Sequence, residues 1–154
     1  MHTLHAIQKL PISVEEAWDF LSSPANLQVI TPPHMGFEIT SAYHGEEMYA
    51  GQIITYIVKP ILGIPIDWCT EITQVDKPHY FIDEQRFGPY AFWHHQHKLK
   101  PIKNGVEMED IVHYKLPLWG IGKIVNAVLV KNQLKDIFDY RRKKVEELFG
   151  KYDG

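Results

Sequence analysis

The C-terminal part of the chain has the spacing of one long amphipathic helix, and this is the strongest constraint on the fold. From about residue 121 to residue 149, apolar residues recur at intervals of three and four, which places them on one helix face. They are Ile121, Ile124, Val125, Val128, Leu129, Ile137, Phe138, Val145, Leu148 and Phe149. At about 1.5 Å per residue, the helix would be about 40 Å long, enough to lie across a whole sheet. Gly150 is a natural end for it.

Six runs of residues before that helix have the composition and the punctuation of β-strands. They cover residues 37–43, 52–58, 66–75, 80–87, 91–99 and 106–116. Turn residues separate the runs, and Asn104-Gly105 joins the last two. This pair is a strong hairpin signal because both residues tolerate positive φ. The pattern predicts an antiparallel meander.

The N-terminal residues predict one more strand and two short helices. Residues 3–10 have a strand-like pattern. Ser13 and Glu16 then form a capping box, in which a hydroxyl at the cap is followed three residues later by a carboxylate, and a helix to about residue 21 follows. Pro24 opens a second short helix, which ends before Pro32-Pro33.

These elements together predict an α+β fold. A curved antiparallel sheet of about seven strands wraps around the long terminal helix, and two short helices follow the first strand. A curved sheet cannot lie flat against one helix along its full length, so we expect a cavity between the two. A chain of 154 residues, 45% of them hydrophobic and 23% charged, suits one domain and is short for two.

Charge, hydropathy and cysteine content argue against several classes of function. The net charge of -3 and the pI near 6.3 give no basic surface for nucleic acid. The longest apolar runs are far shorter than the roughly 20 residues that cross a bilayer, so we expect no integral membrane association. The single cysteine, Cys69, has no partner for an internal disulfide, and no signal peptide opens the chain, which favours a cytoplasmic protein.

Short motifs along nearly the whole chain carry a family resemblance. They are Trp68 with Glu71-Ile72, Phe81-x-Asp83-x-Gln85, Gly88-Pro89-Tyr90, Trp93-x-His95-x-His97, Met108-x-Asp110-x-Val112-x-Tyr114-x-x-Pro117 and Phe138-x-Tyr140-Arg141. With the order of elements, they resemble the SRPBCC helix-grip superfamily, which includes START domains, Bet v 1-like proteins and polyketide cyclase/dehydrase-related proteins. The nearest likeness is to its small bacterial single-domain members. The resemblance implies one START/Bet v 1-like domain over residues 1–154, with a cavity for a lipid-, quinone- or polyketide-like ligand.

Two histidines on one face of a strand are the start of a binding site. In an extended strand over 91–99, Trp93, His95 and His97 share one face. If that face is buried, each imidazole must find a hydrogen-bond partner or a ligand. The hairpin brings Asp110 within cross-strand reach of His95 or His97. The predicted ligand-binding residues are Trp68, Trp93, His95, His97, Met108, Asp110 and Tyr114.

Several roles are open for His95, His97 and Asp110. They can form a structural network that fixes strand register, or the polar end of a ligand pocket. Two histidines and a carboxylate are also a plausible ligand set for zinc or iron, and a His–Asp pair can act as an acid–base catalyst.

The leading interpretation is binding or transport of a small hydrophobic molecule, with no cofactor, no metal and no catalytic residue. The rival is a cyclase, dehydratase or hydrolase that acts on an aromatic or polyketide-like substrate and uses the His–Asp pair. The two interpretations differ in whether the bound molecule is chemically changed.

Two loops flank the expected cavity. The loop over residues 60–65 is apolar, so we expect it to cover the mouth of the pocket as a lid, to touch a membrane transiently or to contact a second copy of the chain. Residues 116–122 lead the last strand into the long helix and include two glycines. We expect a hinge there, with a gate formed by Trp119 as the alternative.

Overall fold

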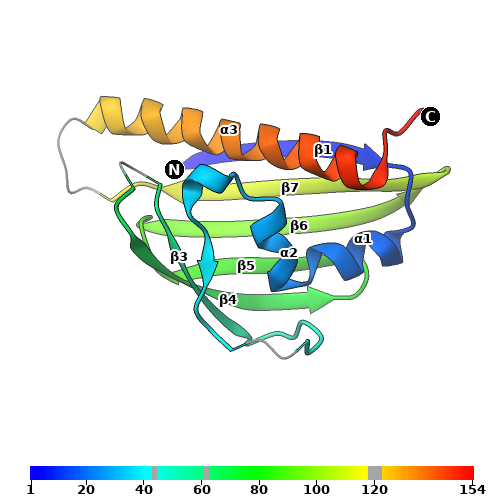
Figure 1. Ribbon diagram of the computed structural model, residues 1–154, viewed down its shortest axis with the longest axis horizontal. Helices are drawn as coiled ribbons and strands as arrows, with labels where there is room; N and C mark the ends of the chain where they lie inside the picture. Colours follow the sequence, from blue (N-terminus) through cyan, green and yellow to red (C-terminus); the bar gives the residue numbers. More distant parts are fainter. Residues whose placement is uncertain (43–44, 61–62, 118–122) are drawn as a thin grey trace.

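A computed structural model of the chain describes residues 1–42, 45–60, 63–117 and 123–154, with the side chains of 123–127 outside the description. The elements are β1 (His2–Leu10), α1 (Val14–Leu21), α2 (Pro24–Val29), the 3-10 turn η1 (Pro33–Met35), β2 (Glu38–Ile39), β3 (Ile53–Val58), β4 (Ile66–Asp76), β5 (Tyr80–Phe87), β6 (Phe92–Ile102), β7 (Gly105–Lys115) and α3 (Lys123–Phe149). Figure 1 shows α3, in yellow to red, running the length of the sheet beside β1 and β7.

The described strands form one seven-stranded antiparallel sheet in the order β1-β7-β6-β5-β4-β3-β2. Strands β2 to β7 follow one another as a meander, and β1 extends the sheet by pairing with β7. The predicted α+β architecture is therefore confirmed: a curved sheet, a long terminal helix and two short helices after the first strand.

The first helix begins where the capping box predicts. The backbone N–H of Glu16 donates to Ser13 Oγ at 3.1 Å, and the backbone N–H of Ser13 donates to Glu16 Oε2 at 2.9 Å. Such caps typically stabilise a helix by about 1 kcal/mol. The cap fixes the start of α1 and thereby directs Trp18 into the core, where it is almost fully buried.

One predicted strand is much shorter than expected. The sequence predicts a strand over residues 37–43, but among the described residues 37–42 only Glu38–Ile39 pairs with β3, and residue 43 lies outside the description. The backbone N–H groups of Thr40 and Ser41 both donate to the carbonyl of Thr55, at 2.8 and 3.2 Å. Two successive donors on one acceptor break the alternation of a ladder, so the strand ends after two residues.

Strand β6 is longer than expected because it continues through Pro101 to Ile102. The backbone nitrogen of residue 101 faces the side of β5, yet β5 begins at Tyr80, which pairs with Lys98. No ladder bond is therefore lost at Pro101, which explains why a proline is tolerated there. The other predicted strands match the observed bounds to within one residue, and β5 matches them fully. The predicted start of the long helix at residue 121 lies outside the described residues.

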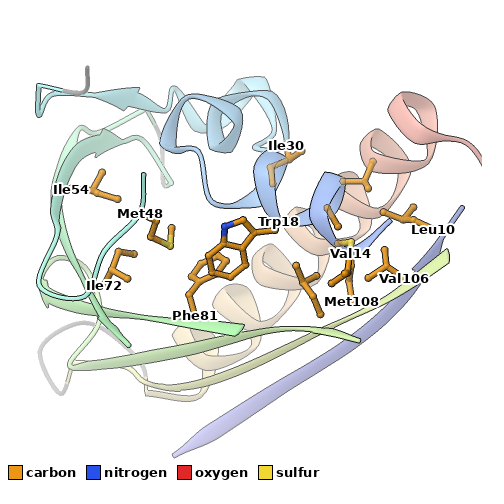
Figure 2. Packing of buried hydrophobic residues seen from close by; sticks show 13 residues of the cluster. Leu10, Val14, Trp18, Ile30, Met48, Ile54, Ile72, Phe81, Val106 and Met108 are labelled. Carbon is orange, nitrogen blue, oxygen red and sulfur yellow. The ribbon is translucent and has the colours of Figure 1, made fainter. Parts of the chain in front are cut away.

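The core consists of two clusters of buried apolar residues. The first joins α1, the sheet and the end of α3, and in it Trp18 packs edge-to-face on Phe81 with ring centroids 5.7 Å apart (Figure 2). The second cluster contains Trp93, Val112 and Leu134, so it connects β6 and β7 to the middle of α3. The two clusters hold the helices on one face of the sheet and leave space between them.

None of the described helices is both long and apolar enough to cross a membrane. Two features expected from the sequence fall partly outside the description. Residues 61–62 of the apolar loop and residues 118–122 of the expected hinge, including Trp119, are not among the described residues.

Candidate functional site

A cavity of about 310 Å³ lies between the inner face of the sheet and helices α2 and α3. Its size is at the lower end of the range typical of small-molecule sites. Most of its lining is apolar and includes Leu27, Ile54, Val58, Ile72, Leu134 and Ile137. The cavity predicted from the curvature of the sheet is therefore present in the structure.

The charged groups of the lining come from β5, β6 and α3. Strand register brings them together: Asp83 of β5 pairs with His95 of β6, and His97 of β6 pairs with Asp110 of β7. All four side chains lie on the inner face of the sheet, where His95 is 4% exposed and His97 is 8% exposed. The predicted neighbourhood of the two histidines and Asp110 is thus observed.

The two imidazoles lie between the two carboxylates. Oδ2 of Asp83 is 2.7 Å from Nε2 of His97 and 3.3 Å from Nδ1 of His95. On the other side, Oδ1 of Asp110 is 2.9 Å from Nε2 of His95 and 3.1 Å from Nδ1 of His97. Each ring nitrogen therefore faces a carboxylate oxygen. We call these four residues the His–Asp cluster.

Two further side chains complete the surroundings of the cluster. Trp93 Nε1 donates a hydrogen bond to Oδ1 of Asp83 at 3.2 Å. Arg141 of α3 lies with Nη1 3.6 Å from Oδ1 of Asp110, and its guanidinium group stacks over the ring of Phe138. Strand β6 thus contributes a hydrogen-bond donor to Asp83, and helix α3 contributes a cation beside Asp110.

Solved structures of other proteins have this architecture at low sequence identity. A START superfamily protein from Mycobacterium smegmatis has a TM-score of 0.68 and 15% identity, over 96% of this chain and 99% of that one. A protein from Arthrobacter aurescens has a TM-score of 0.70 and 13% identity, over 94% of this chain and 86% of that one. Ara h 8.0201, a Bet v 1 allergen, has a TM-score of 0.62 and 14% identity, over 95% of this chain and 98% of that one.

The chain has the helix-grip fold. No protein-family model matches the sequence, and no curated protein is significantly similar to it. At these identities the likeness concerns the fold, and a helix-grip fold hosts many functions. The site itself must therefore carry the functional argument.

Both carboxylates of this helix-grip protein stay charged although they are buried. Burial alone would raise the pKa of Asp83, but the charge of His95 and hydrogen bonds from both imidazoles hold that pKa far below its ordinary value. Burial likewise opposes charge on Asp110, but hydrogen bonds from His95 and His97 and the cation of Arg141 lower its pKa. The cluster therefore holds negative charge inside the protein.

The surroundings of His95 favour its charged form. Burial disfavours the imidazolium, but the attraction of Asp83 and hydrogen bonds to Asp110 and Asp83 outweigh it and raise the pKa of His95 above its ordinary value. The attraction between the carboxylates and His95 and the cation of Arg141 offsets part of the cost of burying the two carboxylates. This internal pairing is how the interior of the protein accommodates the charges.

Two buried donors beside the cluster have no hydrogen-bond partner among the described residues. They are Nε1 of Trp68 and Nε of Arg141, and both side chains line the cavity. An unpaired buried donor costs about 1–3 kcal/mol. A molecule in the cavity that offers oxygen acceptors would remove that cost.

The predicted site residues divide into two groups. Trp68, Trp93, His95 and His97 line the cavity. Asp110 lies behind the imidazoles, while Met108 and Tyr114 belong to the first and the second core cluster and are not part of the cavity lining.

Sequence reasoning did not include Asp83 and Arg141 among the site residues. Asp83 follows Phe81 with a spacing of two, so strand alternation would have put it on the inner face with Phe81. Arg141 lies three residues after Phe138 and four before Val145, on the apolar stripe of the long helix. A charged residue inside an apolar stripe was the available signal in both elements.

The loop expected to cover the cavity approaches α3 at its first residue. Pro60 lines the cavity, and its carbonyl accepts a hydrogen bond from Nε2 of Gln133 in α3. Leu116 and Pro117, which lead out of β7, also line the cavity. Because residues 61–62 and 118–122 are outside the description, the lid, the hinge and the Trp119 gate stay predictions.

Proposed function

We propose that the protein binds a small, largely apolar molecule in the cavity and thereby sequesters or transports it. The observation that carries this proposal is an apolar cavity of about 310 Å³ whose lining includes buried members of the His–Asp cluster. Apolar walls supply affinity, and a few fixed polar groups orient the bound molecule. The START and Bet v 1-type proteins of the same fold support hydrophobic ligand binding in general terms.

The unpaired donors narrow the chemistry of the ligand. Nε1 of Trp68 and Nε of Arg141 can both donate to an oxygen atom. An apolar molecule with a carbonyl or hydroxyl oxygen would satisfy at least one of them, whereas a pure hydrocarbon would leave both unpaired. Lipid-, quinone- and polyketide-like molecules have this combination of an apolar body and oxygen acceptors.

Removal and replacement of the ligand test the proposal. We expect solvent extraction of the purified protein, followed by mass spectrometry, to release a small molecule. The emptied protein should then bind an apolar fluorescent probe. Leu27→Trp, which fills the cavity from α2, should weaken probe binding by at least about tenfold because it occupies the binding volume.

The matched control is Leu148→Trp on the exposed surface of α3, since Leu148 is 46% exposed and outside the cavity lining. This variant should bind the probe like the wild type. A wild-type protein that binds no probe and releases no molecule would contradict the proposal, and so would equal losses in both variants.

The rival enzymatic interpretation predicts a different result for His97→Ala. If the protein only binds its ligand, this variant should retain less of the same molecule, because the polar end of the cavity is damaged. If the protein is a cyclase, dehydratase or hydrolase, the wild type should convert the extracted molecule or a precursor, and His97→Ala should abolish that turnover.

A further inference from the structure

Three side chains of the His–Asp cluster direct one ligand atom each to a common point. One ligand atom from each of Asp83, His95 and His97 lies within 4.8 Å of the other two. The atoms of Asp83 and the imidazoles that contact each other are Oδ2 of Asp83, Nδ1 of His95 and Nε2 of His97. The oxygen is 2.7 Å from the His97 nitrogen and 3.3 Å from the His95 nitrogen. These are atoms of the types that bind zinc and iron.

Two of the three spacings, those from Oδ2 of Asp83 to each imidazole nitrogen, are close to the spacings around a metal ion. Ligand atoms at about 2.0–2.1 Å from zinc are about 2.9 Å apart at a right angle and about 3.3 Å apart at the tetrahedral angle. The contact between Asp83 and His95 already has the larger value, at 3.3 Å. The contact between Asp83 and His97 needs to widen by only a few tenths of an ångström, as the ion replaces the hydrogen between them.

Asp110 lies where many metal sites have a carboxylate that contacts the ligating histidines without contacting the ion itself. Its Oδ1 contacts Nε2 of His95 and Nδ1 of His97, which are the ring nitrogens directed away from Asp83. Outer carboxylates of this kind orient ligating imidazoles and make them better ligands. Trp93 donates to Oδ1 of Asp83 and leaves Oδ2 available. The orientation of all three ligands is therefore fixed by groups other than the ion.

The open side of the three ligands faces the cavity. Asp83, His95 and His97 line it, whereas Asp110 does not. Sites with three protein ligands and an accessible remaining position are typical of metals that bind a water molecule or a substrate. The two carboxylates also supply the negative charge for a dication, and the ion pair of Arg141 is made with Asp110, which is not one of the three ligands.

We propose that Asp83, His95 and His97 bind one divalent transition-metal ion, of the zinc or ferrous-iron class, and that Asp110 is the positioning residue for both imidazoles. The ligand set differs from the one considered from the sequence, in which Asp110 was the carboxylate ligand. The ion's remaining coordination positions face the cavity. This site does not depend on the proposed apolar ligand, because all three ligands belong to the protein.

Metal titration of tag-free protein tests the site directly. After treatment with a chelator, the wild type should bind one Zn²⁺ or Co²⁺ per chain, measured by calorimetry and by the visible absorption of Co²⁺. Asp83→Asn removes a direct ligand and should weaken binding by about 100-fold or more. Asp110→Asn keeps all three ligands but loses their orientation, and should weaken binding by about 10- to 100-fold.

The matched control uses the second His–carboxylate pair on the same strands. His94 and Glu84 are 2.6 Å apart on the outer face of β6 and β5. His94→Gln should leave Co²⁺ binding unchanged. Absence of stoichiometric binding to the wild type would overturn the proposal, as would a loss in His94→Gln equal to that in Asp83→Asn, which would indicate adventitious surface binding.

X-ray absorption of the Zn²⁺-loaded wild type keeps the proposal testable if a variant fails to fold. The spectrum should contain two imidazoles and at least one oxygen ligand, and any other imidazole count would overturn the assignment. Leu27→Trp separates this site from the proposed ligand-binding function, since it should lose the apolar probe and keep the metal. Loss of metal binding with retained probe binding would refute the metal site alone.

Discussion

Asp83 and Asp110 are buried carboxylates that share the same two imidazoles. Their contacts to His95 and His97 span 2.7 to 3.3 Å. Breaking such a buried pair by removal of one partner typically costs about 3–5 kcal/mol, because an uncompensated charge remains. The cluster therefore behaves as a unit, and its protonation is coupled to folding.

The metal-free protein should lose stability on both sides of an intermediate pH. The pKa values of Asp83 and Asp110 are below the ordinary 3.8, so their contribution to the free energy of unfolding is present above that value and is lost as the pH falls below it. The pKa of His95 is raised above 6.5. Its contribution to the free energy of unfolding is therefore complete below pH 6.5 and is lost as the pH rises through the pKa of the folded state. Thermal unfolding in a chelating buffer should give the highest Tm between about pH 4 and pH 6.5.

Two variants separate the cluster from general charge effects on this pH profile. Asp83→Asn should make the acid side of the profile less steep, because one of the two carboxylates that must be protonated there is gone. Glu84→Gln changes a carboxylate on the outer face of the same strand and should leave the shape of the profile unchanged. Identical profiles for the wild type and Asp83→Asn would contradict the assignment.

The β6–β7 hairpin is the element that builds most of the site. It sets His97 opposite Asp110 and places Trp93 and His95 on the same inner face. Its turn consists of Lys103 and Asn104, and Asn104 has a φ of 57°. Gly105 is already the first residue of β7 and pairs with Ile102, so the hairpin lies where it was predicted but turns one residue earlier than an Asn104-Gly105 turn would. The hairpin also meets the end of β1 at Gly105, where a Cβ would lie 2.2 Å from the carbonyl oxygen of Leu10.

Gly105→Ala should therefore destabilise the protein strongly. The added methyl group would meet a backbone atom and not a flexible side chain, so strand β1 or β7 must move. We expect a loss of about 3 kcal/mol in the free energy of unfolding, measured by urea denaturation. Gly45→Ala is the comparison, because a Cβ there meets nothing within 4 Å and only its φ of 81° opposes alanine. It should cost about 1 kcal/mol. A smaller loss at position 105 than at position 45 would argue against this close approach.

At the scale of the whole molecule, the space under the sheet depends on two separate core clusters. Val145, near the end of α3, belongs to the first cluster, whereas Leu134 belongs to the second. The cavity is bordered by residues of both, including Phe81 and Trp93. A ligand in the cavity would therefore contact both parts of the core and stabilise the folded state as a whole.

Ligand binding should raise the thermal stability of the emptied protein. A ligand at 100 times its Kd adds about 2.7 kcal/mol to the free energy of unfolding. For a chain of this size that corresponds to a rise in Tm of about 5–10 °C. Differential scanning fluorimetry with the extracted molecule measures this shift. Leu27→Trp should show little or no shift, and an equal shift in that variant would place the binding site outside the cavity.

The local rules that succeeded are those whose cause lies within a few residues. The capping box at Ser13, the position of the β6–β7 hairpin and the alternation at His95 and His97 depend on a short stretch of chain, so they can be predicted from the sequence. The strand expected over 37–43 failed because hydrogen bonds to Thr55 of another element decide where it ends.

The sequence by itself determined the kinds of elements, their order, and which face of each strand is apolar, because those follow from periodicity and from backbone preferences. The sequence also predicted that the two histidines and Asp110 lie close together, because a hairpin fixes which residues face each other across its two strands. Only the tertiary structure decided that Asp83 and Arg141 join them, because β5 and α3 reach the cluster through sheet pairing and helix packing. The cavity has the same origin, since its volume is what remains after side chains from distant segments have packed.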